Sequence, residues 1–190
     1  MDIKTKAVIK GEISAESIFE VILASRGHKT KGEKEEFLNP VEPTLPYLLK
    51  ESGIKKSVLS TSIKLLDSHL KLGHDICIFG DYDSDGVTST AIMWQAVTAY
   101  SKLTQSSSRI LPFIPDRHKH GYGLSDGAVS EVISGTAFGK TGYSDFSPKL
   151  IITIDTGIVA HVGIQSFRDA GIDVIVTDHH QPEITLPDAN

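Results

Sequence analysis

The feature that most constrains the fold is a regular alternation of short apolar runs and amphipathic stretches after residue 72. Short apolar runs bounded by turn residues are typical of buried strands, whereas apolar residues three and four apart are typical of helices. Strands are predicted at 76–79, 110–114, 150–154 and 173–176, helices at 87–100, 124–133 and 160–170, and surface loops at 101–109 and 134–149. This order predicts an α/β fold with a parallel sheet covered by helices.

The first part of the chain has a different pattern. Ser14 can cap a helix that carries the apolar residues of 18–22, and a second amphipathic helix is predicted at 57–72. The stretch 37–46 between them is loop-like. We therefore expect an N-terminal helical segment, 1–72, packed on a core that comprises 73–190.

The composition excludes several classes of protein. With 39% hydrophobic and 23% charged residues, the 190-residue chain is typical of a globular protein. It shows neither about 18 consecutive apolar residues nor a basic and then apolar leader, so we expect a cytoplasmic protein with no membrane association. Its one cysteine, Cys77, lies in a predicted strand and is expected in the core. The net charge of −5 does not favour a polyanion-binding protein, although 26–31 and 117–120 are locally basic.

Most polar motifs follow the predicted strands directly. Ligands of parallel α/β sheets bind at the carboxyl ends of the strands, where loops and helix N-termini converge. The segments after the four strands contain, in order, Asp81-Tyr82-Asp83-Ser84-Asp85-Gly86, the stretch 115–123, Asp155-Thr156-Gly157, and Asp178-His179-His180. We therefore expect nearly all the chemistry of the chain at one edge of the sheet.

Three aspartates at 81, 83 and 85 repel one another unless a cation lies between them. A calcium EF-hand is excluded, because its twelfth position would be Ile92 instead of glutamate and a strand precedes the loop. Carboxylates with imidazole, and no second cysteine, favour Mn²⁺ or Mg²⁺. Enzymes that hydrolyse phosphate esters commonly use two ions about 3.5–4 Å apart, bridged by one carboxylate. Asp155 could be that bridging carboxylate. Taken singly, Asp155 is also compatible with a simple turn, and His179 with a surface position.

The motifs DYDSDG, DTG and DHH, each after an apolar strand, resemble those of the DHH phosphoesterase superfamily. Within it the chain is most similar to RecJ-type single-stranded-DNA-specific exonucleases, with further markers at 26–27, 37–40 and 113–124. The resemblance implies a manganese- or magnesium-dependent 5′-to-3′ exonuclease that acts on single-stranded DNA in repair and recombination. A single-stranded-DNA-binding protein or a helicase is the protein partner to test.

The resemblance also implies roles for individual residues. Asp81 would bind one metal ion and Asp83 the other, Asp155 would bridge the two, and His179 would complete the Asp83 site. His180 would complete the catalytic set by contacting either phosphate or metal. Two residues are secondary: Asp85, which either braces the loop or binds metal, and Asp178. The nucleophile would be a water activated by metal.

The basic stretch after the second strand is the expected DNA-binding loop. Arg117 can hold a phosphate through two parallel hydrogen bonds. Gly121 and Gly123 would let the backbone approach the DNA, and Tyr122 either stacks on a base or packs beneath the loop. The two histidines of this stretch, His118 and His120, are expected at the surface or against phosphate.

In the family pattern, another metal-binding aspartate and a substrate-gripping lobe follow DHH, and neither occurs before Asn190. We therefore expect a phosphoesterase domain, 73–190, that is incomplete at its C-terminus and weakly active alone. Two alternatives are another DHH enzyme, such as an oligoribonuclease or a cyclic-dinucleotide phosphodiesterase, and a catalytically silent replication scaffold. The GYGL loop and the N-terminal helices favour the exonuclease, and the intact aspartate cluster argues against the scaffold.

Overall fold

The computed structural model describes residues 13–139 and 142–190, and its contacts divide the chain into a unit that ends at Ile54 and a unit Lys55–Asn190. The first unit contains helices α1 (Ala15–Ser25), α2 (Lys31–Leu38) and α3 (Leu45–Ser52). Each begins at a Ser or Thr whose hydroxyl accepts a backbone N–H three residues on, which satisfies one of the free donors of the first turn. The predicted N-terminal helical segment is therefore present.

The second unit is built on a sheet of four parallel strands in the order β2-β1-β3-β4. Its elements are α4 (Lys56–Lys71), β1 (Asp75–Phe79), α5 (Ser84–Leu103), β2 (Ile110–Phe113), α6 (Arg117–His120), α7 (Asp126–Ile133), α8 (Thr136–Gly139), β3 (Pro148–Ile154), α9 (His161–Asp169) and β4 (Asp173–Thr177). The prediction of a parallel α/β sheet is confirmed.

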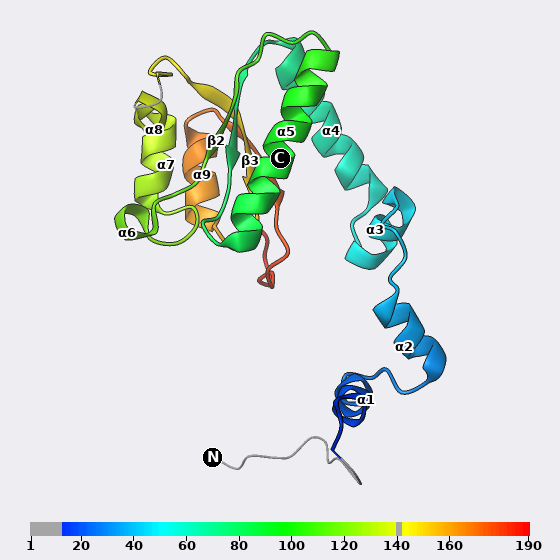
Figure 1. Ribbon diagram of the computed structural model, residues 1–190. Coiled ribbons are helices and arrows are strands. Elements are labelled where there is room, and N and C mark those ends of the chain that lie inside the picture. The colour runs from blue at the N-terminus through cyan, green and yellow to red at the C-terminus, as the bar shows by residue number, and fades with distance from the viewer. Residues whose placement is uncertain (1–12, 140–141) are drawn as a thin grey trace. The chain divides into compact units, whose positions relative to one another are not determined.

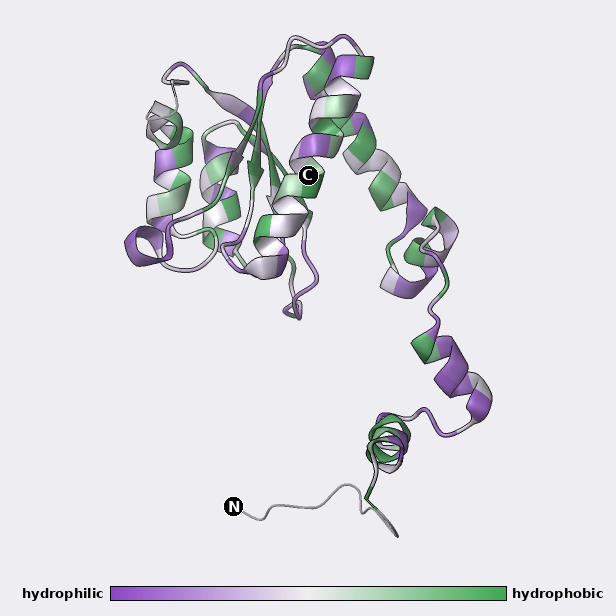
Figure 2. Ribbon diagram, viewed as in Figure 1, coloured by the Kyte–Doolittle hydropathy of each residue, from purple (hydrophilic) through white to green (hydrophobic). Residues whose placement is uncertain are grey.

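Helices cover both faces of this sheet, with α5 on one side and α7 and α9 on the other (Figure 1). Side chains alternate along a strand, so β1 sends Ile76 and Ile78 to the first face and Cys77 and Phe79 to the second. All four are fully buried, and burial raises the pKa of the Cys77 thiol. Figure 2 shows the hydrophobic colour concentrated in the strands, as expected for a sheet buried on both faces.

Helix α4 belongs to the same compact unit as the sheet: Leu70 lies in the core on the α5 side, and the partly buried Leu65 and Leu66 pack against that core. The division of the chain at 72–73, and the packing of the N-terminal helices on the core, stay predictions.

The stretch 134–149 is more than the surface loop that its polar composition predicted. It contains α8, and two of its aromatic side chains, Phe138 and Phe146, are almost fully buried. Their rings lie 4.5 Å apart between centroids and belong to the core on the α7 and α9 side. Isolated aromatic residues have no periodicity along the chain, so the sequence pattern did not reveal this packing.

Candidate metal centre

The turn between β1 and α5 brings the aspartate cluster against the end of the sheet. A side chain at Gly80 would meet the Thr90 hydroxyl at 1.9 Å, and one at Gly86 would meet the Asp81 Cβ at 2.7 Å. Glycine is therefore required for α5 to start this close to β1. The helix begins at Ser84, three residues before its predicted start, and Asp83 caps it by accepting the Gly86 N–H at 3.0 Å.

Asp81 is a buried carboxylate with one free oxygen. Its exposed fraction is 1%. Oδ1 accepts the backbone N–H of Tyr82 at 2.7 Å, whereas Oδ2 is buried without a hydrogen-bond donor among the described residues. Such an atom costs free energy unless a ligand satisfies it.

Asp155, directly after β3, has both an unusual backbone and an unsatisfied side chain. Its φ of 59° is left-handed, a conformation that few residues other than glycine adopt. The side chain is 6% exposed, and neither oxygen has a hydrogen-bond donor in the described part of the chain. The His179 Nε2 lies 2.8 Å from Oδ1, but at an angle unsuited to a hydrogen bond. Burial, and then the nearby Asp85, raise the pKa of Asp155.

In the DHH motif after β4, Asp178 has a structural role and orients His180. The Asp178 side chain is buried and structural: Oδ2 accepts the Ile158 N–H at 2.9 Å, and Oδ1 accepts from the His180 backbone at 3.1 Å. Burial raises the pKa of Asp178, but these hydrogen bonds outweigh it and the net shift is downward. The same Oδ1 lies 2.7 Å from His180 Nδ1, and this hydrogen bond raises the pKa of His180. The Nε2 atom of His180 is thereby left for a ligand, the arrangement typical of metal-binding histidines.

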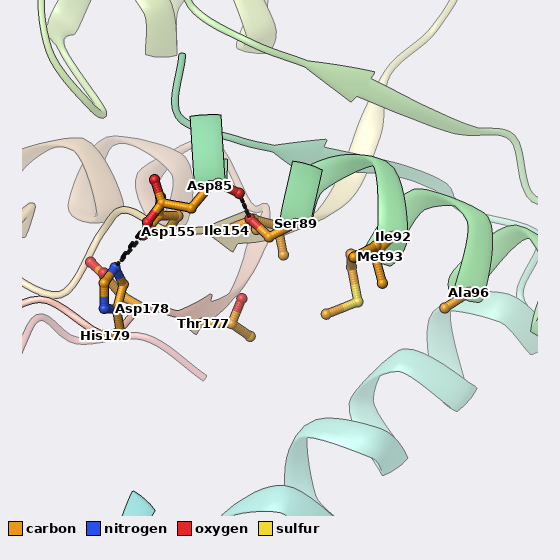
Figure 3. A pocket seen from close by; sticks show the side chains of 10 residues that line it. All are labelled: Asp85, Ser89, Ile92, Met93, Ala96, Ile154, Asp155, Thr177, Asp178 and His179. Atoms are coloured by element: carbon orange, nitrogen blue, oxygen red, sulfur yellow. Dashed lines mark hydrogen bonds and ion pairs between the residues drawn. The ribbon is translucent and has the colours of Figure 1, made fainter. Parts of the chain in front are cut away.

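Two groups of three side chains meet at Asp155, each with its ligand atoms within 4.8 Å of one another. One comprises Asp83, Asp85 and Asp155, and the other comprises Asp155, His179 and His180. Figure 3 shows Asp85, Asp155 and His179 close together, with the dashed contact from His179 to Asp155. The unsatisfied oxygens of Asp81 and Asp155 and the shared position of Asp155 fit a site for divalent cations.

The predicted ligands lie at one edge of the sheet, and the two groups combine them as follows. Asp83 shares a group with Asp85, and His179 shares one with His180, so neither group joins Asp83 to His179. Asp81 is in neither group. The individual metal roles of these residues stay predictions.

Two cavities flank the centre. The larger, about 600 Å³, has an apolar wall from α5 and one acidic end, and its lining is Asp85, Ser89, Ile92, Met93, Ala96, Ile154, Asp155, Thr177, Asp178 and His179. The smaller, about 340 Å³, lies between the loops after α6 and β3 and reaches Asp178 and His180. Tyr122, which is 58% exposed, and Gly123 line this second cavity.

The basic loop after β2 forms the short helix α6, and two of its four basic residues are already paired. Glu131 on α7 forms an ion pair with Lys119, and its Oε2 lies 3.1 Å from His120 Nε2. The other ring nitrogen of His120 accepts the Asp116 N–H at 3.0 Å. His120 therefore fixes the loop, and the expectation of a surface or phosphate-contacting role for it was wrong.

The remaining basic side chains of α6 are Arg117 and His118, both exposed. Figure 2 shows α6 as hydrophilic throughout. The Arg117 Cζ lies 5.3 Å from the ring centroid of Tyr82. Sequence reasoning singled out neither Tyr82 nor Glu131, because no motif or spacing shows that either residue meets the basic loop.

The family model "DHH family, N-terminal domain" matches residues 75–190. Two curated relatives are named single-stranded-DNA-specific exonuclease RecJ. The one from Escherichia coli (strain K12) is 37% identical over 168 residues, or 88% of this chain and 25% of the relative. The one from Bacillus subtilis (strain 168) is 35% identical over 167 residues, or 88% of this chain and 18% of the relative. The chain therefore spans a quarter or less of their length.

Two solved structures have a similar fold. A crystal structure of exonuclease RecJ bound to manganese has a TM-score of 0.55 at 34% identity, covering 69% of this chain and 29% of that one. A crystal structure of RecJ from Thermus thermophilus in complex with Mn²⁺ has a TM-score of 0.52 at 28% identity, covering 88% and 19%. In the described residues, no helix has the length and hydropathy of a membrane span. The family match begins at the first residue of β1 and holds all the candidate ligands, so the chain belongs to the DHH family.

Proposed function

We propose that the chain carries the metal-binding half of a phosphodiesterase site and that the protein removes nucleotides from the 5′ end of single-stranded DNA. The observation that carries this proposal is the set of buried, unsatisfied carboxylate oxygens on Asp81 and Asp155. They lie in a family whose relatives are named single-stranded-DNA exonucleases and have been crystallised with manganese.

We propose Mn²⁺ or Mg²⁺ as the cofactor, held by Asp81, Asp83, Asp155 and His179. Divalent ions at this position would make a water nucleophilic at neutral pH and withdraw charge from the scissile phosphate. Asp155 would bridge the two ions, because both candidate groups include it. Asp178 would hold His180 through the 2.7 Å contact, so that His180 presents Nε2 to metal or phosphate.

The DNA would approach along the basic loop. Arg117 is exposed beside the centre and would bind a backbone phosphate, while Gly121 and Gly123 would let the backbone come close. Tyr122 is 58% exposed and lines the smaller cavity, which supports stacking on a base over packing beneath the loop.

The alternative functions have less support. A silent scaffold would keep three buried carboxylate oxygens of Asp81 and Asp155 without hydrogen-bond donors among the described residues, which lowers stability and serves no ligand. An oligoribonuclease or a cyclic-dinucleotide phosphodiesterase would use the same metal centre, but the relatives that cover 88% of the chain are named for single-stranded DNA. We extend the proposal to a cytoplasmic protein of DNA repair and recombination, with a single-stranded-DNA-binding protein or a helicase as the partner to test.

The test is nucleotide release from single-stranded DNA labelled at either the 5′ or the 3′ end, in the presence of Mn²⁺. We expect release from the 5′ end, slow with residues 1–190 and faster with a version extended by the further length that the relatives have. Asp81→Asn should abolish release, and Lys149→Ala, an exposed residue at the other end of β3, should leave it unchanged. Release from the 3′ end, or equal rates for Asp81→Asn and the original chain, would contradict the proposal.

A further inference from the structure

Three side chains from two loops meet beside the aspartate cluster. Tyr82, the residue between Asp81 and Asp83, lies at the centre. The guanidinium carbon of Arg117 is 5.3 Å from the Tyr82 ring centroid, a cation–π distance. The Tyr122 ring packs edge-on against Tyr82, with 6.1 Å between centroids and an interplanar angle of 84°.

Arg117 has no carboxylate partner within 4.0 Å in the described part of the chain. Arg109 shows the contrast: it lies 5.6 Å from the Phe146 ring centroid, but Asp75 and Asp145 also accept its N–H groups. The charge of Arg109 is neutralised, whereas the contact of Arg117 with Tyr82 leaves its charge and its N–H donors free.

We infer that Tyr82 is a positioning residue whose ring face holds the Arg117 guanidinium beside the metal centre, ready to bind a phosphate of single-stranded DNA. This inference rests on the proposed function and names how that site holds its substrate.

The physical reason for an aromatic ring at this position lies in the geometry of the guanidinium. A carboxylate would bind two in-plane N–H groups, the same groups that a phosphate needs, and would cancel the charge. A ring attracts the cation through its π face and accepts none of the in-plane donors. It also restricts a flexible side chain before DNA binds, which lowers the entropy cost of binding.

The Tyr82 backbone ties this arrangement to the metal centre. Its N–H donates to Asp81 Oδ1 at 2.7 Å, so the ring projects from a backbone fixed by a candidate ligand. A tyrosine phenol is already uncharged at neutral pH, and burial and then Asp81 raise the pKa of Tyr122 further. The phosphate-binding arginine is therefore held in a constant position relative to the aspartates, as in-line attack on a phosphodiester requires.

The experiment measures the dissociation constant of the chain for a 5′-phosphorylated single-stranded oligonucleotide, by fluorescence anisotropy at fixed salt. Tyr82→Leu and Tyr82→Gln, which lack an aromatic face, should each weaken binding by about threefold to tenfold. Tyr82→Phe keeps the face and should stay within about twofold of the original chain. Tyr143→Leu, at an exposed tyrosine outside this cluster, is the control and should change nothing.

A double-mutant cycle separates positioning from general structure. In the Arg117→Ala background, Tyr82→Leu should cause no further loss, because the side chain that the ring positions is gone. Calorimetric Mn²⁺ affinity should be the same for Tyr82→Leu and the original chain.

Each contrary outcome has its own meaning. Weak binding by Tyr82→Phe, a full additional loss in the Arg117→Ala background, or a fall in Mn²⁺ affinity would overturn the positioning role. Unchanged binding by both Tyr82→Leu and Tyr82→Gln would overturn it as well. If the original chain binds no oligonucleotide at all, the proposed function fails, and the inference falls with it.

Discussion

Two aspartates at the amino ends of the parallel strands, Asp75 and Asp173, differ from two that follow the carboxyl ends, Asp81 and Asp155, in how their oxygens are paired. At the amino ends of the strands, Asp75 accepts two N–H groups of Arg109 at 2.6 and 2.8 Å. Asp173 lies 3.0 Å from Nε2 of the buried His69. At the carboxyl ends, Asp81 and Asp155 are at most 7% exposed, yet three of their four oxygens lack a donor among the described residues.

The difference shows which charges serve stability and which are kept for a ligand. Removing a carboxylate from water is costly unless a partner replaces the lost solvation. The amino end supplies that partner from within the chain. At the carboxyl end, Oδ2 of Asp81 and both oxygens of Asp155 have no hydrogen-bond donor among the described residues, and this is the expected state of a site that binds cations.

The largest expected effect is at Asp155, the residue that both candidate metal groups share. Asp155→Asn should lower Mn²⁺ affinity by about a hundredfold or more, since loss of a ligand exceeds the tenfold to hundredfold cost of losing its supports. Asparagine tolerates the φ of 59°, so the fold should persist. Isothermal titration calorimetry measures the change, and unaltered affinity would place the metal elsewhere.

Although Asp155→Asn should weaken metal binding, it should make the metal-free fold more stable. The pKa of Asp155 is raised in the folded state, so its contribution to stability is greatest below the unfolded pKa and declines as pH rises through the folded pKa. At neutral pH the charged carboxylate therefore destabilises the metal-free fold. Asp155→Asn should raise the metal-free unfolding free energy at pH 7, and a decrease would contradict this account.

The next largest effect concerns the amino end. Arg109→Met should lower the unfolding free energy by about 2 kcal/mol, because it leaves Asp75 with the Ser147 N–H as its remaining polar contact at this site. The value is below that of a fully buried pair because the Arg109 side chain is 36% exposed. Urea denaturation measures it, with Asp75→Asn in the same chain expected to restore part of the loss. The Mn²⁺ affinity of Arg109→Met should equal that of the original chain. A lower affinity would contradict the assignment of Asp75 to stability alone.

The smallest expected effect concerns Glu131. It tests whether a carboxylate on the carboxyl side of the sheet contributes to stability when it has a partner within the chain. Glu131 contacts the basic loop on the carboxyl side of the sheet, yet it is paired with Lys119, and the Lys119 hydrogen bond lowers its pKa. A lowered pKa gives stability that is present above the unfolded pKa and lost as pH falls through the folded pKa. Glu131→Gln should therefore cost a few tenths of a kcal/mol at pH 7.

The matched measurement for Glu131→Gln is urea denaturation at a pH below the lowered folded-state pKa of Glu131, where the carboxyl group of the original chain is protonated. There the difference between variant and original should vanish. An equal difference at both pH values would show that the charge of Glu131 is not what stabilises the loop.

Much of the fold could be predicted because it depends on local patterns. Apolar runs placed all four strands, and turn residues placed the aspartate loop, DTG and DHH at one edge. The boundaries were less accurate: α5 starts at Ser84 because Asp83 caps it, which its apolar pattern does not show. The buried Phe138 and Phe146 lie in a stretch predicted as a surface loop, because long-range packing leaves no periodic signal.

Residue types and their spacing along the chain were enough to predict the order of strands and helices, the position of the carboxylates at one edge, and the resemblance to a metal-dependent family. The tertiary structure was needed to show that neither oxygen of Asp155 has a hydrogen-bond donor among the described residues, that Glu131 contacts His120, and that Tyr82 lies against Arg117. Two of these contacts join residues that are 11 and 35 positions apart along the chain, and the third finding depends on which donors surround a buried atom. A partner across space is fixed by how the loops pack, and no local pattern records it.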